Sequence, residues 1–234
     1  MSEFKVLEIF SSISGEAQHA GELTTFVRLS GCNLCCDYCD TRNMLIENNF
    51  NIMSISDIIQ KCKDNNHRHV ILTGGEPLNK PDIEKLIAEL LKNDFEVEIE
   101  TNGTQSFITI KDVLNVMHIP EDLISNLSFT IDYKMGFSGM EEFMNPEVFE
   151  NLSALNENDT IKFVVAENDI EHCMELIKKF QKQGTKCKYY ISPVFGEVEM
   201  PHIIDAMKKH NLNNDVRFQV QIHKYVWDPN KTGV

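Results

Sequence analysis

Four cysteines lie within eight residues in the first fifth of the chain, at Cys32, Cys35, Cys36 and Cys39. Cys32, Cys36 and Cys39 have the spacing C-x3-C-x2-C, and Cys35 also permits C-x2-C-x3-C. Thiolates are soft ligands, so three of them on a short loop can hold one inorganic cluster and leave one metal position open. A structural zinc site would instead need four ligands, which Cys35 or a distant histidine could complete. The spacing alone leaves both kinds of site open.

A Gly-Gly-Glu-Pro turn at residues 74–77 directly follows the apolar run from His69 to Thr73. Glycines in such a turn let the backbone approach a ligand closely, Glu76 can accept hydrogen bonds from an ammonium group, and Pro77 stiffens the end of the turn. By itself the pattern could be only a turn. Downstream of the cysteine loop, however, it resembles the radical S-adenosylmethionine (SAM) superfamily.

Apolar runs of strand length alternate with amphipathic helical stretches along the whole chain, which predicts β-α units around a largely parallel sheet. We expect strands over residues 6–10, 25–30, 69–73, 96–100, 127–132, 161–165, 188–191 and 217–222. We expect helices over residues 56–63, 81–92, 110–117, 146–155, 170–183 and 201–210. Ser56 is expected to cap its helix, and Pro81 and Pro201 suit first helical turns because the amide there needs no partner.

Six β-α units after an extra leading strand are too few for a closed eight-unit barrel of roughly 250 residues. The prediction is therefore an α/β fold, an open partial (βα)6-type TIM-like barrel with an extra N-terminal strand. No linker, repeat or low-complexity segment divides the chain, so we expect a single domain over residues 1–234. The unusual residues follow strand ends, which predicts one shared site at the C-terminal face of the sheet.

The composition favours a small ligand over nucleic acid. The 234 residues include 22 Lys and Arg against 36 Asp and Glu, a net charge of −14, which repels phosphate backbones. No apolar stretch approaches the roughly 20 residues that span a bilayer, and no leader precedes the first strand, so we expect no membrane contact and a cytoplasmic location. The remaining cysteines, Cys62, Cys173 and Cys187, are expected to be small buried hydrophobic residues.

The superfamily resemblance implies a 4Fe–4S cluster on Cys32, Cys36 and Cys39, with SAM bound at the fourth iron. Reductive cleavage of SAM then yields a 5′-deoxyadenosyl radical that abstracts hydrogen from a substrate, while the protein orients the reactants and excludes water. Residues matching the superfamily motifs would bind SAM: Gly74, Gly75 and Glu76 at its amine, and Glu100 and Asn102 along its ribose. Further candidates for the cofactor site are Asp132, Lys134 and Ser192.

Four segments further resemble the 7-carboxy-7-deazaguanine synthase family: residues 9–16, 26–34, 39–41 and 219–224. This resemblance covers nearly the whole chain and implies that a pterin-like substrate faces Glu16, Arg28, Thr73 and His223. Such side chains suit a 2-amino-4-oxopyrimidine ring, which offers donors to a carboxylate and acceptors to an imidazole or hydroxyl. Arg28 could instead pair with a substrate carboxylate. Thr41 matches a threonine that helps hold magnesium in that family.

Two segments depart from the synthase pattern. Ser14 and Ala17 replace the glutamine and second glycine of the usual S-I-Q-G-E-G, and residues 135–138 read Met-Gly-Phe-Ser where a proline and paired serines are expected. Both changes lie on the substrate side, so Ser14 and Phe137 are predicted to contact a different, larger 7-deazapurine. The altered loops favour the related queuine lyase, which would release 7-aminomethyl-7-deazaguanine. Arg28 and Thr41 favour the synthase, which contracts 6-carboxytetrahydropterin.

We therefore expect a radical SAM lyase acting on queuine, with the synthase reaction as the alternative. A non-catalytic zinc or electron-carrying module would use all four clustered cysteines but leaves the Gly-Gly-Glu-Pro turn unexplained. A glycyl-radical activase shares the cysteine loop but leaves Glu16, Arg28 and His223 unexplained. The resemblance also implies a flavodoxin or ferredoxin as the reductant, and a homodimer.

Overall fold

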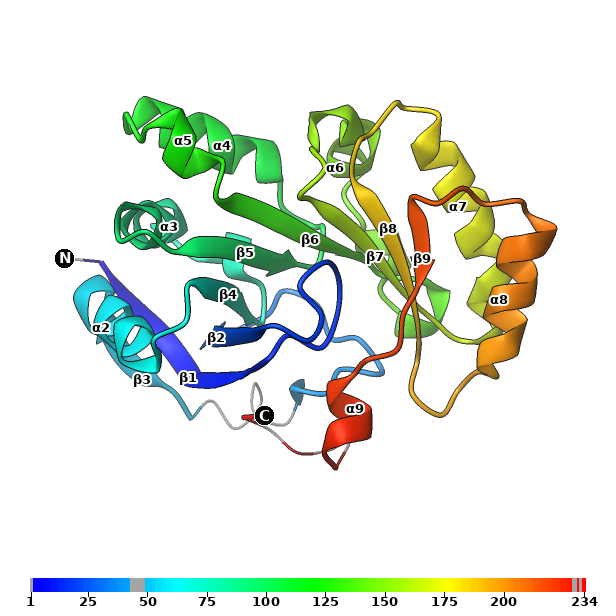
Figure 1. Ribbon diagram of the computed structural model, residues 1–234, viewed down its shortest axis with the longest axis horizontal. Helices are drawn as coiled ribbons and strands as arrows, with labels where there is room; N and C mark the ends of the chain where they lie inside the picture. Colours follow the sequence, from blue (N-terminus) through cyan, green and yellow to red (C-terminus); the bar gives the residue numbers. More distant parts are fainter. Residues whose placement is uncertain (1, 43–48, 229–230, 232) are drawn as a thin grey trace.

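A curved sheet forms the centre of the molecule in the computed structural model, which describes residues 2–42, 49–228, 231 and 233–234 (Figure 1). Within those ranges the strand order is β3-β1-β2-β4-β5-β6-β7-β8-β9. The strands are β1 (Glu3–Ile13), β2 (Leu23–Leu29), β3 (Asn51–Ser54), β4 (His69–Gly74), β5 (Glu96–Thr101), β6 (Leu127–Tyr133), β7 (Thr160–Val165), β8 (Lys188–Pro193) and β9 (Val216–Phe218).

The sheet is parallel from β2 through β4 to β9, and β1 runs antiparallel to both β2 and β3. The predicted open α/β barrel is thus confirmed, with two antiparallel strands at its N-terminal edge where one extra strand was expected. Parallel strands end at the same edge of the sheet, and the register places Arg28 of β2 directly beside Thr73 of β4. The two side chains therefore enter the same part of the barrel.

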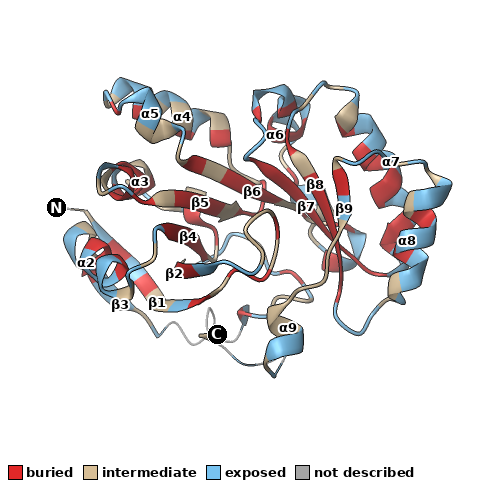
Figure 2. Ribbon diagram, in the orientation of Figure 1, coloured by how far each residue is buried: buried red, intermediate tan, exposed pale blue. Residues whose placement is uncertain are grey.

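Helices α2 to α8 lie along the outside of the curved sheet, and α9 lies apart from them near the C-terminus (Figure 1). Their bounds are α2 (Ile55–Asn65), α3 (Ile83–Lys92), α4 (Phe107–Val116), α5 (Glu121–Ile124), α6 (Pro146–Glu150), α7 (Ile170–Gln181), α8 (Met200–Lys209) and α9 (His223–Val226). Short 3-10 turns are η1 (Pro77–Asn79), η2 (Gly136–Ser138), η3 (Glu141–Phe143), η4 (Leu152–Ala154) and η5 (Glu167–Asp169). Burial is concentrated in the strands and on the helix faces that meet them (Figure 2).

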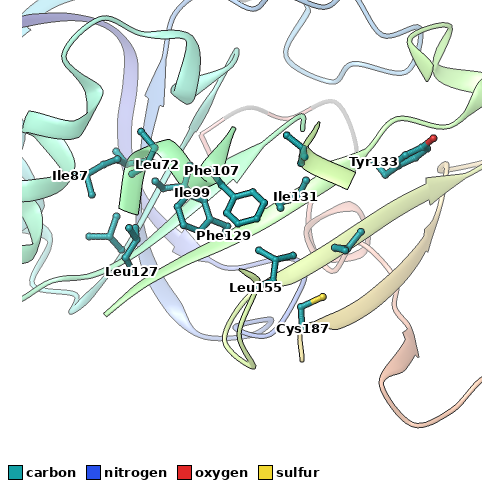
Figure 3. Packing of buried hydrophobic residues seen from close by; sticks show 14 of the residues in the cluster. Leu72, Ile87, Ile99, Phe107, Leu127, Phe129, Ile131, Tyr133, Leu155 and Cys187 are labelled. Atoms are coloured by element: carbon teal, nitrogen blue, oxygen red, sulfur yellow. The ribbon is translucent and has the colours of Figure 1, made fainter. Parts of the chain in front are cut away.

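The main hydrophobic core lies between the sheet and these helices. Leu72, Ile99 and Phe129 come from three adjacent strands and are fully buried. Phe107 of α4 packs on Phe129 with 5.7 Å between the ring centroids, as Figure 3 shows. The three cysteines outside the cysteine loop are also buried, as predicted, at Cys62, Cys173 and Cys187. The described residues include no helix that is long and apolar enough to span a bilayer.

Several predicted element ends differ in the structure. Ser54, rather than Ser56, caps α2, because its hydroxyl accepts from the Asp57 amide while the Asp57 carboxylate accepts from Ser54. Pro81 lies before α3, whose N-cap is Asp82 in a left-handed conformation. Pro201 does occupy the first turn of α8, as expected.

The predicted helix over 146–155 is divided into α6 and the turn η4, and the predicted last strand ends at Phe218. The strand β3 and the single-turn helices α5 and α9 were not predicted, since four residues give too short a pattern to recognise. His223 consequently opens a short helix instead of following directly on a strand.

Candidate active site

A cavity of about 560 Å³ lies where the cysteine loop meets the C-terminal ends of the parallel strands. This volume is in the range of roughly 300–1,000 Å³ that small-molecule sites occupy. Its lining includes most of the residues predicted for the site: Cys32, Cys36, Cys39, Thr41, Gly74, Gly75, Glu100, Asn102, Asp132, Lys134, Glu16, Arg28, Thr73, Phe137 and His223. Residues spread over the whole sequence thus meet in one place, as the strand topology predicts.

The cysteine loop directs three of its four thiols into the cavity. Cys32, Cys36 and Cys39 line it, and Asn102 Nδ2 lies 3.7 Å from Cys32 Sγ. Cys32 and Cys35 are both exposed, but Cys35 lies outside the lining and its Sγ contacts Met140 Sδ at 4.0 Å. The arrangement therefore fits the C-x3-C-x2-C interpretation and does not fit a four-thiolate zinc site.

Burial raises the pKa of two of these thiols. The pKa of Cys36 is raised to about 11, and that of Cys32 is raised as well, in both cases mainly by desolvation. The nearby Cys39 thiol adds a smaller upward contribution to each pKa, as expected for thiols that converge. A metal cluster replaces the thiol protons when it binds. Three converging thiols in a partly closed cavity are a donor set that fits a 4Fe–4S cluster.

The glycine turn after β4 packs directly against the cysteine loop. The Gly75 amide donates to Leu29 O at 3.0 Å, and the Glu76 amide donates to Gly31 O at 3.1 Å. A Cβ atom on Gly75 would lie 1.9 Å from Gly31 O and 2.6 Å from the Cys32 amide nitrogen. Only glycine permits this approach of two backbones, so Gly75 sets the position of the cysteine loop.

The variant Gly75→Ala is expected to lose most of its bound iron and most of its activity, because the backbone at Gly31 and Cys32 must move away from the added methyl group. Gly184→Ala is the control, since a Cβ there meets no atom within 4 Å and only its left-handed conformation is strained, by about 1 kcal/mol. Iron and sulfide content of anaerobically reconstituted protein measures the effect. Full iron content in Gly75→Ala would contradict the assigned role.

Glu76 links the glycine turn to the end of β5. It is fully buried, and its carboxylate accepts from the Leu78 amide at 3.0 Å, the Thr101 hydroxyl at 2.7 Å and the Asn102 amide at 2.7 Å. Because one of its oxygens accepts from the Asn102 amide, Glu76 fixes the backbone at Asn102, which does line the cavity. Its expected contact with the SAM amine stays a prediction, and in this structure its carboxylate accepts from the turn and from the end of β5.

Lys162 of β7 connects the charged groups inside the barrel. Its side chain is 9% exposed, with Nζ 3.0 Å from Glu16 Oε2 and 3.6 Å from Asp132 Oδ2. Lys134 Nζ donates to the same Asp132 oxygen at 2.7 Å. Burial alone would lower the pKa of Lys162, but the carboxylates of Glu16, Asp132 and Glu100 raise it well above its ordinary value. Lys162 is therefore a buried cation that holds the carboxylates of the cavity in place.

Two oxygens of this network are free for a ligand. Glu16 Oε1 and Asp132 Oδ1 are buried and accept no hydrogen bond within the described chain. A buried acceptor without a donor is costly, so the arrangement fits a bound molecule that donates to both carboxylates.

Sequence reasoning missed Lys162, although its signal was present. The residue is a lysine within the otherwise uncharged strand Thr160–Val165, in a parallel sheet whose strands are ordinarily buried on both faces. A charge at such a position requires a partner or a ligand inside the barrel.

Arg28 and Thr73 enter the cavity side by side. Thr73 Oγ1 donates to Glu100 Oε2 at 2.6 Å. Arg28 Nε donates to Glu8 Oε1 at 2.8 Å, and its guanidinium lies over the Phe10 ring at 5.8 Å. Arg28 therefore pairs with Glu8, whereas Glu16 pairs with Lys162.

His223 closes the cavity from the C-terminal segment. A Cβ on Gly15 would lie 2.3 Å from His223 Nδ1, so the imidazole packs directly on the glycine beside Glu16. The Ile222 amide also donates to Gly15 O at 3.0 Å. Desolvation lowers the pKa of His223, which favours the neutral imidazole that can both donate and accept.

Ser14 and Ser192 lie outside the cavity lining, whereas Phe137 lies within it. Ser14 is buried, and its hydroxyl donates to Glu16 O at 3.1 Å, so it shapes the loop without lining the cavity. Ser192 is buried in β8 and also lies outside the lining. Phe137 does line the cavity but is 38% exposed and stacks on Tyr38, with 6.5 Å between the ring centroids. The Phe137 side chain, which departs from the synthase pattern, is therefore partly exposed to solvent.

Comparison with known proteins identifies the family of the chain. Residues 26–120 match the Radical SAM superfamily. A 7-carboxy-7-deazaguanine synthase from Clostridium acetobutylicum is 42% identical over 234 residues, covering 99% of both chains. Another synthase of this name, from Methanospirillum hungatei, is 34% identical over 97% of this chain and 87% of its own length.

Solved structures support the same fold. The crystal structure of QueE from Escherichia coli superposes with a TM-score of 0.69 at 23% identity, covering 94% of this chain and 95% of that one. SuiB from Streptococcus suis, bound to its precursor peptide SuiA, superposes with a TM-score of 0.53 at 15% identity over 81% of this chain and 46% of that one. Together with the cavity geometry, the full-length similarity shows that this chain belongs to the 7-carboxy-7-deazaguanine synthase family of the radical SAM superfamily.

Proposed function

We propose that this protein converts 6-carboxy-5,6,7,8-tetrahydropterin to 7-carboxy-7-deazaguanine with loss of ammonia. The observation that carries the proposal is the presence of the three cysteines and of Glu16, Arg28, Thr73 and His223 in the lining of one cavity. The synthase names of the full-length relatives support it.

The free carboxylate oxygen of Glu16 suits the pyrimidine half of such a substrate. A 2-amino-4-oxopyrimidine presents adjacent N–H donors, and Glu16 Oε1 is a buried acceptor without a donor. The neutral imidazole of His223 lies beside Gly15 and can donate to or accept from the same ring. Lys162 fixes the other oxygen of Glu16, so the acceptor is already oriented before the substrate binds.

As a member of the radical SAM superfamily, the chain uses a 4Fe–4S cluster and SAM, which together supply hydrogen-atom abstraction from the substrate. We assign the cluster to Cys32, Cys36 and Cys39, and SAM to the adjoining Gly74, Gly75, Glu100 and Asn102. Glu76 holds the backbone at Asn102, and Lys134 orients Asp132. These residues place the two reactants in one cavity and limit the access of water.

The altered loops favour queuine lyase, but the comparisons favour the synthase. Matches to curated synthases extend over the entire chain, including both altered segments. The structure offers a physical reason for tolerance at these positions, because Ser14 lies outside the cavity lining and Phe137 is partly exposed. The changes therefore do not require a different substrate.

Turnover with the two substrates tests the proposal. The cluster is reconstituted anaerobically, and dithionite and SAM are added with either 6-carboxytetrahydropterin or queuine. Mass spectrometry then follows 5′-deoxyadenosine and the base product. Ring contraction of the pterin, with queuine unchanged, is the expected result, whereas cleavage of queuine to 7-aminomethyl-7-deazaguanine with the pterin unchanged would overturn the proposal.

The variant Arg28→Gln is expected to raise KM for 6-carboxytetrahydropterin by about 100-fold, because a charge-assisted contact to the substrate carboxylate is worth roughly 1.5–3 kcal/mol. Arg217→Gln is the matched control: Arg217 also lies over an aromatic ring, 5.7 Å from the Tyr190 centroid, but outside the cavity lining. Steady-state kinetics on cluster-matched samples measure the change. An equal KM in Arg28→Gln and the original protein would exclude this role for Arg28.

Three further expectations belong to this proposal. We assign magnesium to Thr41, whose buried hydroxyl lies 3.5 Å from Cys39 Sγ in the cavity, together with the substrate carboxylate. The cluster needs an external one-electron donor, for which we propose a flavodoxin or a ferredoxin. We also propose a homodimer, which light scattering distinguishes from a single chain.

A further inference from the structure

A second group of metal-binding side chains lies at the N-terminal end of the parallel strands, away from the cysteine loop. His69 is the first residue of β4, and His19 and Glu22 lie in the loop between β1 and β2. The candidate ligand atoms of these three residues all lie within 4.8 Å of one another. Side chains from two separate segments thus converge on a volume that one metal ion could fill.

His69 supplies an independent sign that a ligand is missing. The side chain is 5% exposed, yet neither Nδ1 nor Nε2 makes a hydrogen bond within the described chain. Glu98 Oε2 lies 3.3 Å from Nε2, within ion-pair distance, whereas no polar partner is found for Nδ1. With Nε2 beside Glu98, the buried Nδ1 is the nitrogen left without a hydrogen-bond partner, which points to a ligand there.

Glu98 is held in position to orient His69. Its Oε1 accepts from the Thr130 hydroxyl at 2.6 Å, and the carboxylate is buried. Metal-bound histidines commonly direct their second ring nitrogen to a carboxylate of this kind, which fixes the tautomer and leaves the other nitrogen for the metal. With Nε2 facing Glu98, Nδ1 is the nitrogen that remains for an ion.

The two loop residues form an ion pair beside His69. His19 Nδ1 lies 3.0 Å from Glu22 Oε2, and the His19 and His69 rings are 4.1 Å apart between their centroids. By contrast, His202 and Glu167 form an exposed pair that belongs to no such three-residue group. The convergence of three ligands distinguishes this cluster from an ordinary surface ion pair.

We propose that His19, Glu22 and His69 bind one divalent transition-metal ion of the zinc class, with Glu98 orienting His69. Two imidazoles and one carboxylate form a donor set for Zn²⁺ or Fe²⁺, whereas Mg²⁺ prefers oxygen ligands. The ion would join the β1–β2 loop to β4. The same loop carries Gly15 and Glu16, so the metal stabilises the segment that presents Glu16 to the active-site cavity.

Metal analysis of the full-length, cluster-loaded protein tests the site. Zn²⁺ is titrated anaerobically against a chromophoric competitor. Iron and zinc are both measured in the same samples, because a chain that lacks the cluster could bind zinc through its cysteine loop. We expect one zinc ion per chain without loss of iron, and no competition by Mg²⁺. The ligand variants Glu22→Gln and His19→Asn should each weaken zinc binding at least about 10-fold, and Glu98→Gln should weaken it about 10-fold to 100-fold.

His202→Asn is the matched control, because it removes a histidine from an exposed pair with Glu167 and should leave zinc affinity unchanged. A second readout is hydrogen–deuterium exchange over residues 14–22, which zinc should slow in the original protein and leave unchanged in Glu22→Gln. Equal zinc affinity in the original protein and in the His19→Asn/Glu22→Gln double variant would overturn the proposal. So would an absence of zinc-dependent protection in the loop.

Discussion

Replacing Lys162 with methionine is expected to lower kcat/KM by about 100-fold or more and the free energy of unfolding by about 3 kcal/mol. The lysine is the buried cation between Glu16 and Asp132, at 3.0 Å and 3.6 Å. Without it, Asp132 keeps Lys134 but Glu16 loses its ion-pair partner in a cavity that also contains Glu100, so the protonated form of Glu16 becomes less costly than its carboxylate. A protonated or displaced Glu16 would no longer present an oriented acceptor to the substrate.

A matched pair and a double variant separate this effect from a general loss of stability. Lys188→Met removes a strand lysine paired with Asp215 at 2.6 Å outside the cavity, and should leave kcat/KM nearly unchanged. If Lys162 acts by orienting Glu16, the double variant Lys162→Met/Glu16→Gln should lose little more activity than either single variant. Fully additive losses, with iron content and melting temperature controlled, would contradict that coupling.

The sequence was most informative where one local pattern determines structure. Each of the eight predicted strands corresponds to a strand in the sheet, because runs such as His69 to Thr73 are apolar enough to be buried on both faces. The strand order then brings the motif residues together without further information, since parallel strands end at one edge. Cys32 and Gly75, which are 43 positions apart, meet for this reason.

The sequence could not predict which charged side chains pair with one another in the folded structure. Glu16 pairs with Lys162, 146 positions away, and Arg28 pairs with Glu8, although Glu16 is nearer to Arg28 along the chain. No spacing rule encodes such pairs, because they depend on which side chains the barrel curvature turns inward. The hydrogen bonds that Glu76 accepts from Thr101 and Asn102 at the end of β5 likewise could not be predicted from its own turn.

The preference for a lyase shows a related limit. Changes at Ser14 and Phe137 were given functional weight because they fall within motif segments. In the structure, the first side chain bonds to its own loop and the second lies partly in solvent. Membership of a motif segment therefore does not by itself place a side chain in the cavity, since Phe137 lines it and Ser14 does not.

Replacing Cys36 with serine is expected to abolish the iron–sulfur cluster and reduce turnover to background, whereas Cys35→Ser should keep both. Cys36 lines the cavity with Cys32 and Cys39, while Cys35 is exposed and contacts Met140. Serine preserves the size of the side chain but is a poor ligand for iron, so the variant removes one of three anchors with little change in packing. Iron and sulfide content, the visible absorbance of the cluster and formation of 5′-deoxyadenosine measure the outcome.

Cys32, Cys35 and Cys39 also satisfy a C-x2-C-x3-C spacing. If the cluster is lost in Cys35→Ser and kept in Cys36→Ser, the loop binds metal in a different conformation from the one described.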